Sequence, residues 1–144
     1  MKIDTINLLK ECNSGIKMGV SSIDRVMPYV KSEKLKKALN ACKDEHATLG
    51  DESHKLILKY GADTKEPHPV ARMMGDMKIR SKMMMMNRTD KTVADLMTDG
   101  CNMGVKSLSK YLNEYKRADG EVKNLVNRVI SVEQSLTEQM RAYL

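Results

Sequence analysis

The chain has 144 residues, of which 41% are hydrophobic and 31% charged, a composition typical of one globular domain. Its 25 Lys and Arg against 19 Asp and Glu give a formal net charge of +6, and it has 13 Met but no Phe or Trp. No apolar run reaches the roughly 18 residues of a membrane span, and no secretory signal precedes Lys2 and Asp4. Three widely spaced cysteines, Cys12, Cys42 and Cys101, fit neither a disulfide framework nor a zinc site. We therefore expect reduced thiols in a cytoplasmic protein.

The first part of the chain predicts two helices joined by a tight turn. Apolar positions recur in steps of 4 and 3, which is the spacing of one buried helix face rather than of a strand. A helix is predicted over residues 4–29, where Pro28 kinks or ends it because proline lacks an N–H donor. A second helix is predicted to run to Tyr60, with Ser32 as its N-cap and Gly61 as its left-handed C-terminal residue. The predicted buried faces are Cys12, Ile16, Gly19, Ile23, Val26 and Val30 in the first helix, and Leu35, Leu39, Cys42, His46, Leu49, Ser53 and Leu56 in the second.

Residues 61–88 form a long connection, and a structureless loop of that length is uncommon in a compact domain. Within it, methionines and one valine recur at helical spacing, while basic side chains fall mostly on the other side. We therefore predict a short amphipathic crossover helix that lies across the bundle. Residues 72–88 hold five basic side chains and one acidic side chain, so most of the net charge is here. The apolar positions are Val70, Met73, Met74, Met77 and Met84.

The last part of the chain repeats the pattern of the first. Thr89 or Asp90 can cap a third helix that runs to about Tyr115, and Asp119 can cap a fourth that reaches the C-terminus. The string Met-Gly-Val that begins at Met18 recurs at an offset of 85 residues. The predicted buried faces have the same steps as those above, at offsets of 85 and 87. They are Met97, Cys101, Gly104, Leu108, Tyr111 and Tyr115, then Val122, Val126, Val129, Glu133, Leu136, Met140 and Tyr143. The pattern predicts an internally duplicated helical hairpin.

Two hairpins, over residues 4–60 and 89–144, joined by a crossover over residues 61–88, predict one all-α domain covering residues 1–144. This organisation resembles the ferritin-like antiparallel four-helix bundle, including small uncharacterised bacterial proteins of that type. The family's di-iron site takes a Glu from two helices and a Glu-x-x-His from each of the other two. This chain departs from that set, because Glu45 and His46 are adjacent and the helix that carries Glu133 has no His. The resemblance therefore implies the fold without a retained di-iron motif.

His46 and Glu133 are matched polar positions within the two apolar faces. Counting from the hairpin turns places Gly19 level with His46 and Gly104 level with Glu133. One interpretation is a buried His–Glu hydrogen bond for which the small glycines make room. The alternatives are a register error that leaves these side chains exposed, and a small ligand or metal ion between them. A metal ion would need further ligands, for which Glu11, Glu45 or a cysteine are the candidates.

The chain has no Ser-His-Asp order, no Gly-rich phosphate loop and no His-Glu-x-x-His motif, so we expect no enzymatic activity and no cofactor. We expect a bundle that self-associates or binds a protein partner through its Met-rich basic crossover helix. The expected interaction residues are Met73, Met77, Met83, Met84, Met85, Met86, Arg72, Arg80 and Lys82.

Two alternatives stay open. One is a degenerate metal-binding or redox bundle that holds a transition metal ion at its centre, with His46, Glu133, Glu45 and Glu11 as candidate ligands. The other is weak binding of an anionic surface through residues 72–88, because a basic amphipathic helix suits such a surface. No specific nucleic-acid binding is expected, because the segment lacks aromatic residues on which bases could stack.

Overall fold

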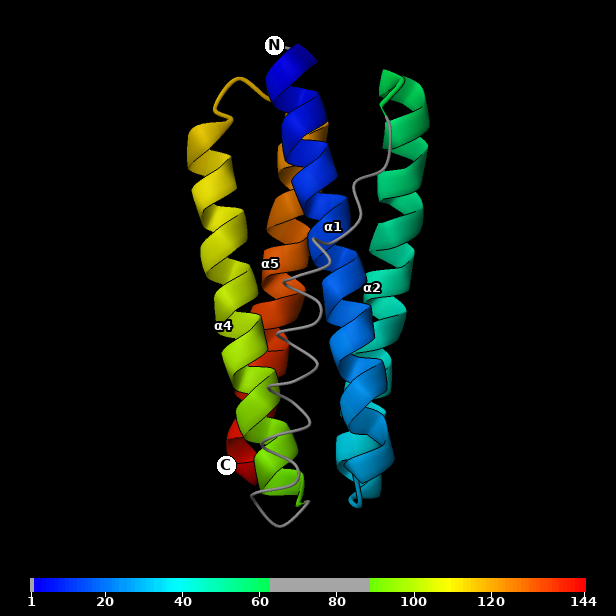
Figure 1. Ribbon diagram of the computed structural model, residues 1–144, viewed down its shortest axis with the longest axis vertical. Helices are drawn as coiled ribbons and strands as arrows, with labels where there is room; N and C mark the ends of the chain where they lie inside the picture. The colour runs from blue at the N-terminus through cyan, green and yellow to red at the C-terminus, as the bar shows by residue number, and fades with distance from the viewer. Residues whose placement is uncertain (1, 63–88) are drawn as a thin grey trace.

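The computed structural model describes residues 2–62 and 89–144, and all regular structure within them is helical. Four long helices lie side by side along the long axis of the molecule (Figure 1). They are α1 (Lys2–Val26), α2 (Glu33–Tyr60), α4 (Asp90–Glu114) and α5 (Gly120–Met140), with short 3₁₀ turns η1 (Met27–Tyr29) and η2 (Arg141–Tyr143). The all-α prediction and the four helices are thus confirmed, whereas the predicted crossover helix lies outside the described residues.

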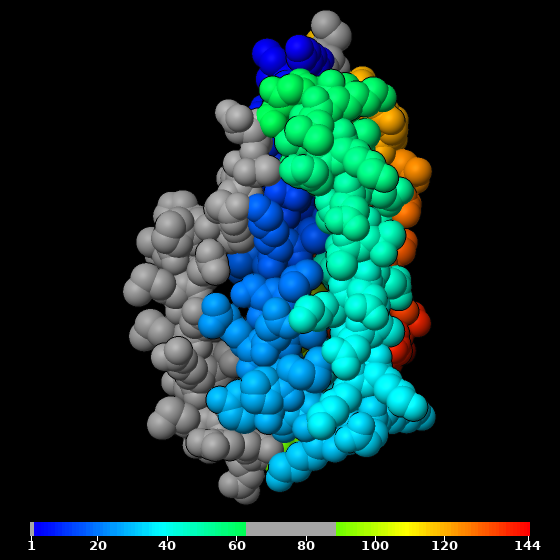
Figure 2. Space-filling model, turned by 90° about the vertical axis from the view of Figure 1, so that its right-hand side faces the viewer, coloured from blue at the N-terminus to red at the C-terminus, as the bar shows by residue number. Residues whose placement is uncertain are grey.

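Sequential helices run in opposite directions within each half of the bundle. α1 runs away from the end that holds the N-terminus and α2 returns to it, and α4 and α5 form a second hairpin beside them (Figure 1). α1 packs on α2 and α4, and α5 packs on α4 and α2. Figure 2 shows α1 and α2 side by side along the length of the molecule. α2 ends at one end of the bundle and α4 begins at the other.

Most helix ends lie where capping chemistry predicts them. The Ser32 hydroxyl accepts a hydrogen bond from the Leu35 backbone N–H at 3.2 Å, and Gly61 ends α2 with a φ of 66°. Left-handed backbone of this kind is cheapest for glycine because it has no Cβ. Pro28 lies in the turn η1 directly after α1, and Thr89 caps α4 through the N–H of Thr92 at 3.3 Å.

Several details of the prediction are wrong. α5 ends at Met140 rather than at the C-terminus, and Tyr111, Tyr115 and Tyr143, predicted on the buried faces, are half-buried. Asp119 is the N-cap of α5, but its side chain makes no capping hydrogen bond and instead accepts one from the Tyr60 hydroxyl at 2.7 Å. The tyrosine at the end of α2 thus competes for the carboxylate that would otherwise cap α5. Near the end of α2 the buried residue is Ile57, while Leu56 is half-buried. A strict 4, 3 spacing drifts around a straight helix by about 20° per heptad, which moves the buried face by one residue.

At each end of the bundle, an aspartate of one hairpin accepts hydrogen bonds from the turn of the other hairpin. The Asp90 carboxylate, in the first turn of α4, accepts hydrogen bonds from the backbone N–H groups of Lys31 and Ser32, at 2.8 and 3.0 Å. Asp4, in the first turn of α1, accepts one from the backbone N–H of Arg117 at 3.0 Å. Each hairpin therefore uses its first-turn aspartate to satisfy the otherwise unpaired backbone donors in the turn of the other hairpin.

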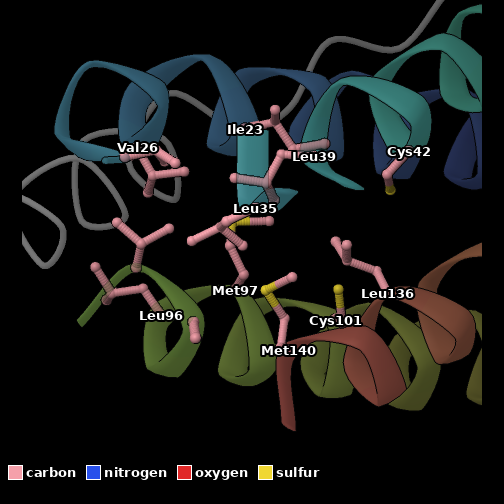
Figure 3. Close-up of a cluster of buried hydrophobic side chains, with 13 residues drawn as sticks. Ile23, Val26, Leu35, Leu39, Cys42, Leu96, Met97, Cys101, Leu136 and Met140 are labelled. Atoms are coloured by element: carbon pink, nitrogen blue, oxygen red, sulfur yellow. The ribbon is translucent and has the colours of Figure 1, made fainter. Parts of the chain in front are cut away.

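The apolar core consists of two clusters, one toward each end of the bundle. The first, drawn in Figure 3, contains Ile23, Val26, Val30, Leu35, Leu39, Cys42, Val93, Ala94, Leu96, Met97, Cys101, Leu136 and Met140. The second contains Leu8, Leu9, Cys12, Ile16, Leu49, Ile57, Leu108, Ala118, Val122, Leu125, Val126 and Val129. Fully burying one such large side chain contributes about 1.5–3 kcal/mol. None of the described helices is both long and apolar enough to cross a membrane.

Candidate functional site

His46 on α2 and Glu133 on α5 face each other in the interior of the bundle. The imidazole Nε2 lies 3.7 Å from the Glu133 Oε1, and the two side chains are only 2% and 8% exposed. The prediction that these residues meet in one buried layer is confirmed. The predicted direct hydrogen bond is not present, because 3.7 Å is an ion-pair distance and is too long for a hydrogen bond.

The imidazole is held by the preceding turn of its own helix. Its Nδ1 lies 2.9 Å from the backbone carbonyl oxygen of Cys42 and 3.5 Å from the Cys42 Sγ. Since a carbonyl oxygen only accepts hydrogen bonds, Nδ1 must carry a proton and donate it. In a neutral ring Nε2 would then be a bare acceptor that faces a carboxylate. The geometry therefore calls for one further proton shared between His46 and Glu133.

The charge of this layer follows from the same contacts. Burial lowers the pKa of His46, but its contacts with the Cys42 side chain, with the Glu133 carboxylate at ion-pair distance and with the Cys42 backbone outweigh burial and raise it to about 10. At neutral pH the ring is therefore an imidazolium paired with the Glu133 carboxylate. Such a pair is strongly coupled in a medium of low dielectric constant, so loss of either partner leaves an uncompensated buried charge.

A glycine on each neighbouring helix makes the room for this pair. A Cβ atom added to Gly19 on α1 would lie 2.7 Å from His46 Nε2 and 2.9 Å from its Cδ2. A Cβ added to Gly104 on α4 would overlap the Glu133 carboxylate. The four helices thus contribute one residue each to a single layer, two side chains and two bare backbones. The predicted level of both glycines is confirmed.

Two polar atoms of this layer are buried without a hydrogen-bond partner, His46 Nε2 and Glu133 Oε2. An unsatisfied buried polar atom typically costs about 1–3 kcal/mol, so such atoms are uncommon in folded proteins. They point either to a compensating ion-pair attraction or to a small polar group held between them.

All three thiols of the protein border the same layer and are free and buried. Cys42 and Cys101 belong to the first apolar cluster, with their sulfur atoms pointing into the bundle interior (Figure 3), and Cys12 belongs to the second. Burial, with the nearby Glu133 charge, raises the pKa of both Cys12 and Cys101 to about 12. These thiols stay protonated at neutral pH and are poor nucleophiles. The sequence placed them on the buried faces but gave no sign that they flank one carboxylate.

The other predicted metal ligands do not complete the layer. Glu45 is exposed on α2 and Glu11 is half-buried on α1. Among residues 2–62 and 89–144, no three His, Cys, Asp or Glu side chains are grouped so as to hold a metal ion. The di-iron set implied by the ferritin-like resemblance does not fit either, because α1 and α4 supply Gly19 and Gly104 where carboxylates would be needed.

A surface hollow of about 640 Å³ lies between α1 and α2 above the His46 ring. Its lining includes basic and acidic side chains, among them Lys17, Arg25, Asp24 and Asp51, so it presents no single charge to a ligand. Because the His46 side chain is only 2% exposed, the hollow gives almost no access to the buried pair.

The predicted interaction residues fall outside the part of the chain that the structure describes. They are Met73, Met77, Met83, Met84, Met85, Met86, Arg72, Arg80 and Lys82. Comparison of the chain with protein-family models, with curated proteins and with solved structures finds no match. The candidate site is therefore interpreted from its own geometry.

Proposed function

We propose that the chain is a ferritin-like four-helix bundle that arose by internal duplication of a helical hairpin. Three sets of residues support this, because members separated by 85–87 positions have the same role in the two halves. Gly19 and Gly104 make room for a buried polar side chain, and Asp4 and Asp90 accept from the turn of the opposite hairpin. The third set is the buried pair itself, His46 on α2 and Glu133 on α5. A cytoplasmic location is part of the proposal and is supported by the unpaired thiols.

The bundle acts, in this proposal, by binding another protein or a second copy of itself rather than by catalysis. The observation that carries the proposal is closure of its polar layer. His46 and Glu133 are almost fully buried, and their neighbours at the same level are glycines in direct contact with them. A catalytic group must reach its substrate to within hydrogen-bond distance, and although the hollow between α1 and α2 borders the His46 ring, that side chain is only 2% exposed. We therefore propose that the chain acts through residues on its surface.

The surface we propose for binding is the Met-rich basic segment between the hairpins. Four consecutive methionines, Met83 to Met86, cannot all be buried on one side of a helix, and flexible thioether side chains suit an adaptable apolar contact. The basic residues of the same segment would favour an acidic rim on the partner. The same basic residues would alternatively support weak attachment to an anionic membrane surface.

Sedimentation velocity tests this proposal. The wild-type protein is compared with a variant in which Met83 to Met86 are all replaced by Ser, and Met103→Ser is the control because Met103 is 63% exposed on α4. The quadruple variant is expected to shift to the monomer while the control behaves as wild type. An identical distribution for all three proteins would refute self-association through this segment. Flotation with anionic vesicles over a range of salt concentrations separates membrane attachment, which salt weakens.

A second candidate function, binding of one transition metal ion at the bundle centre, is favoured by a specific observation. His46 Nε2 and Glu133 Oε2 are both buried and have no hydrogen-bond partner. One nitrogen and one carboxylate are too few for a tight site, so a neighbouring thiol would have to join them. Elemental analysis of protein purified without chelator tests this candidate. Absence of a stoichiometric transition metal in protein grown in metal-supplemented medium would exclude it.

A further inference from the structure

Each hairpin of a duplicated pair could in principle pack against the other hairpin or against a copy of itself from a second chain. If residues 2–62 and 89–144 derive from one hairpin, as proposed above, their inner faces are equivalent and each could pack against a copy of itself from another chain. The chain instead pairs the first hairpin with the second, with α1 on α4 and α2 on α5. The covalent link already favours pairing within one chain, and a contact that penalises the two like pairings would add specificity to it.

The ends of the bundle make that distinction only weakly, because the unlike contact there, from the Tyr60 hydroxyl to the Asp119 carboxylate, is exposed to solvent. Asp4 and Asp90 are the same residue at equivalent positions, and both accept from backbone N–H groups, which any hairpin turn offers. The ion pairs that join the hairpins on the surface, Arg128 with Glu52 and Lys59 with Glu121, have side chains about 40–60% exposed. Exposed ion pairs contribute little to stability and therefore discriminate weakly.

The middle layer does distinguish the pairings. We propose that His46 and Glu133 are specificity-determining residues that make each hairpin pack against the other rather than against a copy of itself. Pairing of two first hairpins would set two His46 rings against each other, each with its Nδ1 already committed to the Cys42 carbonyl. Pairing of two second hairpins would bury two Glu133 carboxylates together. Either arrangement places like groups in a medium of low dielectric constant, whereas the unlike pair shares one proton with balanced charge.

The glycines should allow the histidine and the glutamate to exchange positions. Gly19 faces His46, and Gly104 faces Glu133, so each polar position looks onto bare helix backbone. A longer or shorter polar side chain therefore meets the same small neighbour at either position. The two residues should accordingly be exchangeable between α2 and α5, which an irregularly packed layer would not allow.

The first experiment exchanges them in the full-length chain. Three variants are compared with wild type by thermal unfolding: His46→Glu, Glu133→His, and the two substitutions combined. Each single variant sets like groups against each other and should lower the melting temperature by about 10 °C. The combined variant should regain at least half of the summed loss. A combined variant no more stable than the sum of the two single changes would overturn the proposal.

The second experiment tests partner choice directly. Full-length His46→Glu and Glu133→His chains, carrying tags of different mass, are unfolded together, refolded and analysed by native mass spectrometry. Exchange of hairpins between the two chains would restore a His–Glu pair in both layers, so a mixed dimer should dominate. Differently tagged wild-type chains, refolded together, give the background of ordinary self-association, and that control alone tests the proposed function.

The two variants need not fold separately for the result to count. A mixed dimer at least threefold above the wild-type background supports the proposal, including the case in which each variant refolds only in the mixture. A mixed fraction equal to the background, or a mixture that does not refold, overturns it. Mixing each variant with the Glu138→Gln protein, which changes an exposed carboxylate on α5, should give no enrichment.

Discussion

Alanine substitution at two glycines of α1 should have opposite effects on stability. Gly15 and Gly19 lie one turn apart in the same helix, so Gly→Ala at either position gains about 1 kcal/mol of helix propensity. A Cβ at Gly15 would lie 3.7 Å from the Leu108 Cδ2, an ordinary contact. A Cβ at Gly19 would lie 2.7 Å from His46 Nε2, and the ring cannot retreat freely because its Nδ1 is bonded to the Cys42 carbonyl.

The difference between the two variants isolates the crowding at His46. The helix term is common to both and cancels, which leaves an overpacking cost of about 1–3 kcal/mol for Gly19→Ala relative to Gly15→Ala. Urea unfolding followed by far-ultraviolet circular dichroism measures it as a difference in midpoint at constant slope. Free energies of unfolding that agree within about 0.5 kcal/mol would refute the packing of His46 against α1. Adding His46→Ala to both variants should abolish the difference.

Three further outcomes are expected. Because the folded pKa of His46 is raised to about 10 from 6.5, its contribution to stability is complete below about pH 6.5 and is lost as pH rises through 10. Urea midpoints should therefore fall over that range, and Glu133→Gln should flatten the curve while the exposed-site control Glu138→Gln keeps its slope. A thiol reagent such as Ellman's should detect almost no cysteine in the native protein at pH 8 and all three in denaturant, and rapid native reaction would contradict the buried positions. Asp90→Ala frees two backbone donors between the hairpins and should cost about 1–2 kcal/mol by urea unfolding, whereas an unchanged midpoint would mean that water replaces the carboxylate equally well.

The helices could be predicted from the sequence because the information is local. Apolar spacing of 4 and 3 marks one face of a helix wherever it occurs, and Ser32 and Gly61 mark helix ends through contacts within a few residues. The layer of His46, Glu133 and the two glycines was also predictable, because matched spacing in two halves fixes relative height without any knowledge of side-chain orientation. Contacts between helices could therefore be predicted only where the internal repeat showed which residues lie at the same height in the bundle.

The repeat gives no information on lateral position, so the hydrogen bonds between the two hairpins were not predicted. Whether Asp90 accepts from the turn at Lys31, or Tyr60 reaches Asp119, depends on how α4 and α2 are placed sideways, which spacing along one helix does not encode. The 3.7 Å separation of the central pair was missed for the same reason, because the distance between α2 and α5 decides between a hydrogen bond and an ion pair. Lateral placement is a property of the packed core as a whole.

A gain in stability does not explain why the central layer contains His46, Glu133 and two glycines. Two glycines in helix interiors each cost about 1 kcal/mol relative to alanine, and a buried ion pair commonly does no better than apolar side chains of similar volume. The variant that combines His46→Leu with Glu133→Leu should therefore unfold at the same urea concentration as wild type or a higher one. When tagged chains are refolded together, however, it should form more mixed oligomers than wild type, because both like pairings become compatible. A loss of more than about 2 kcal/mol would mean instead that the ion pair itself holds α2 and α5 together.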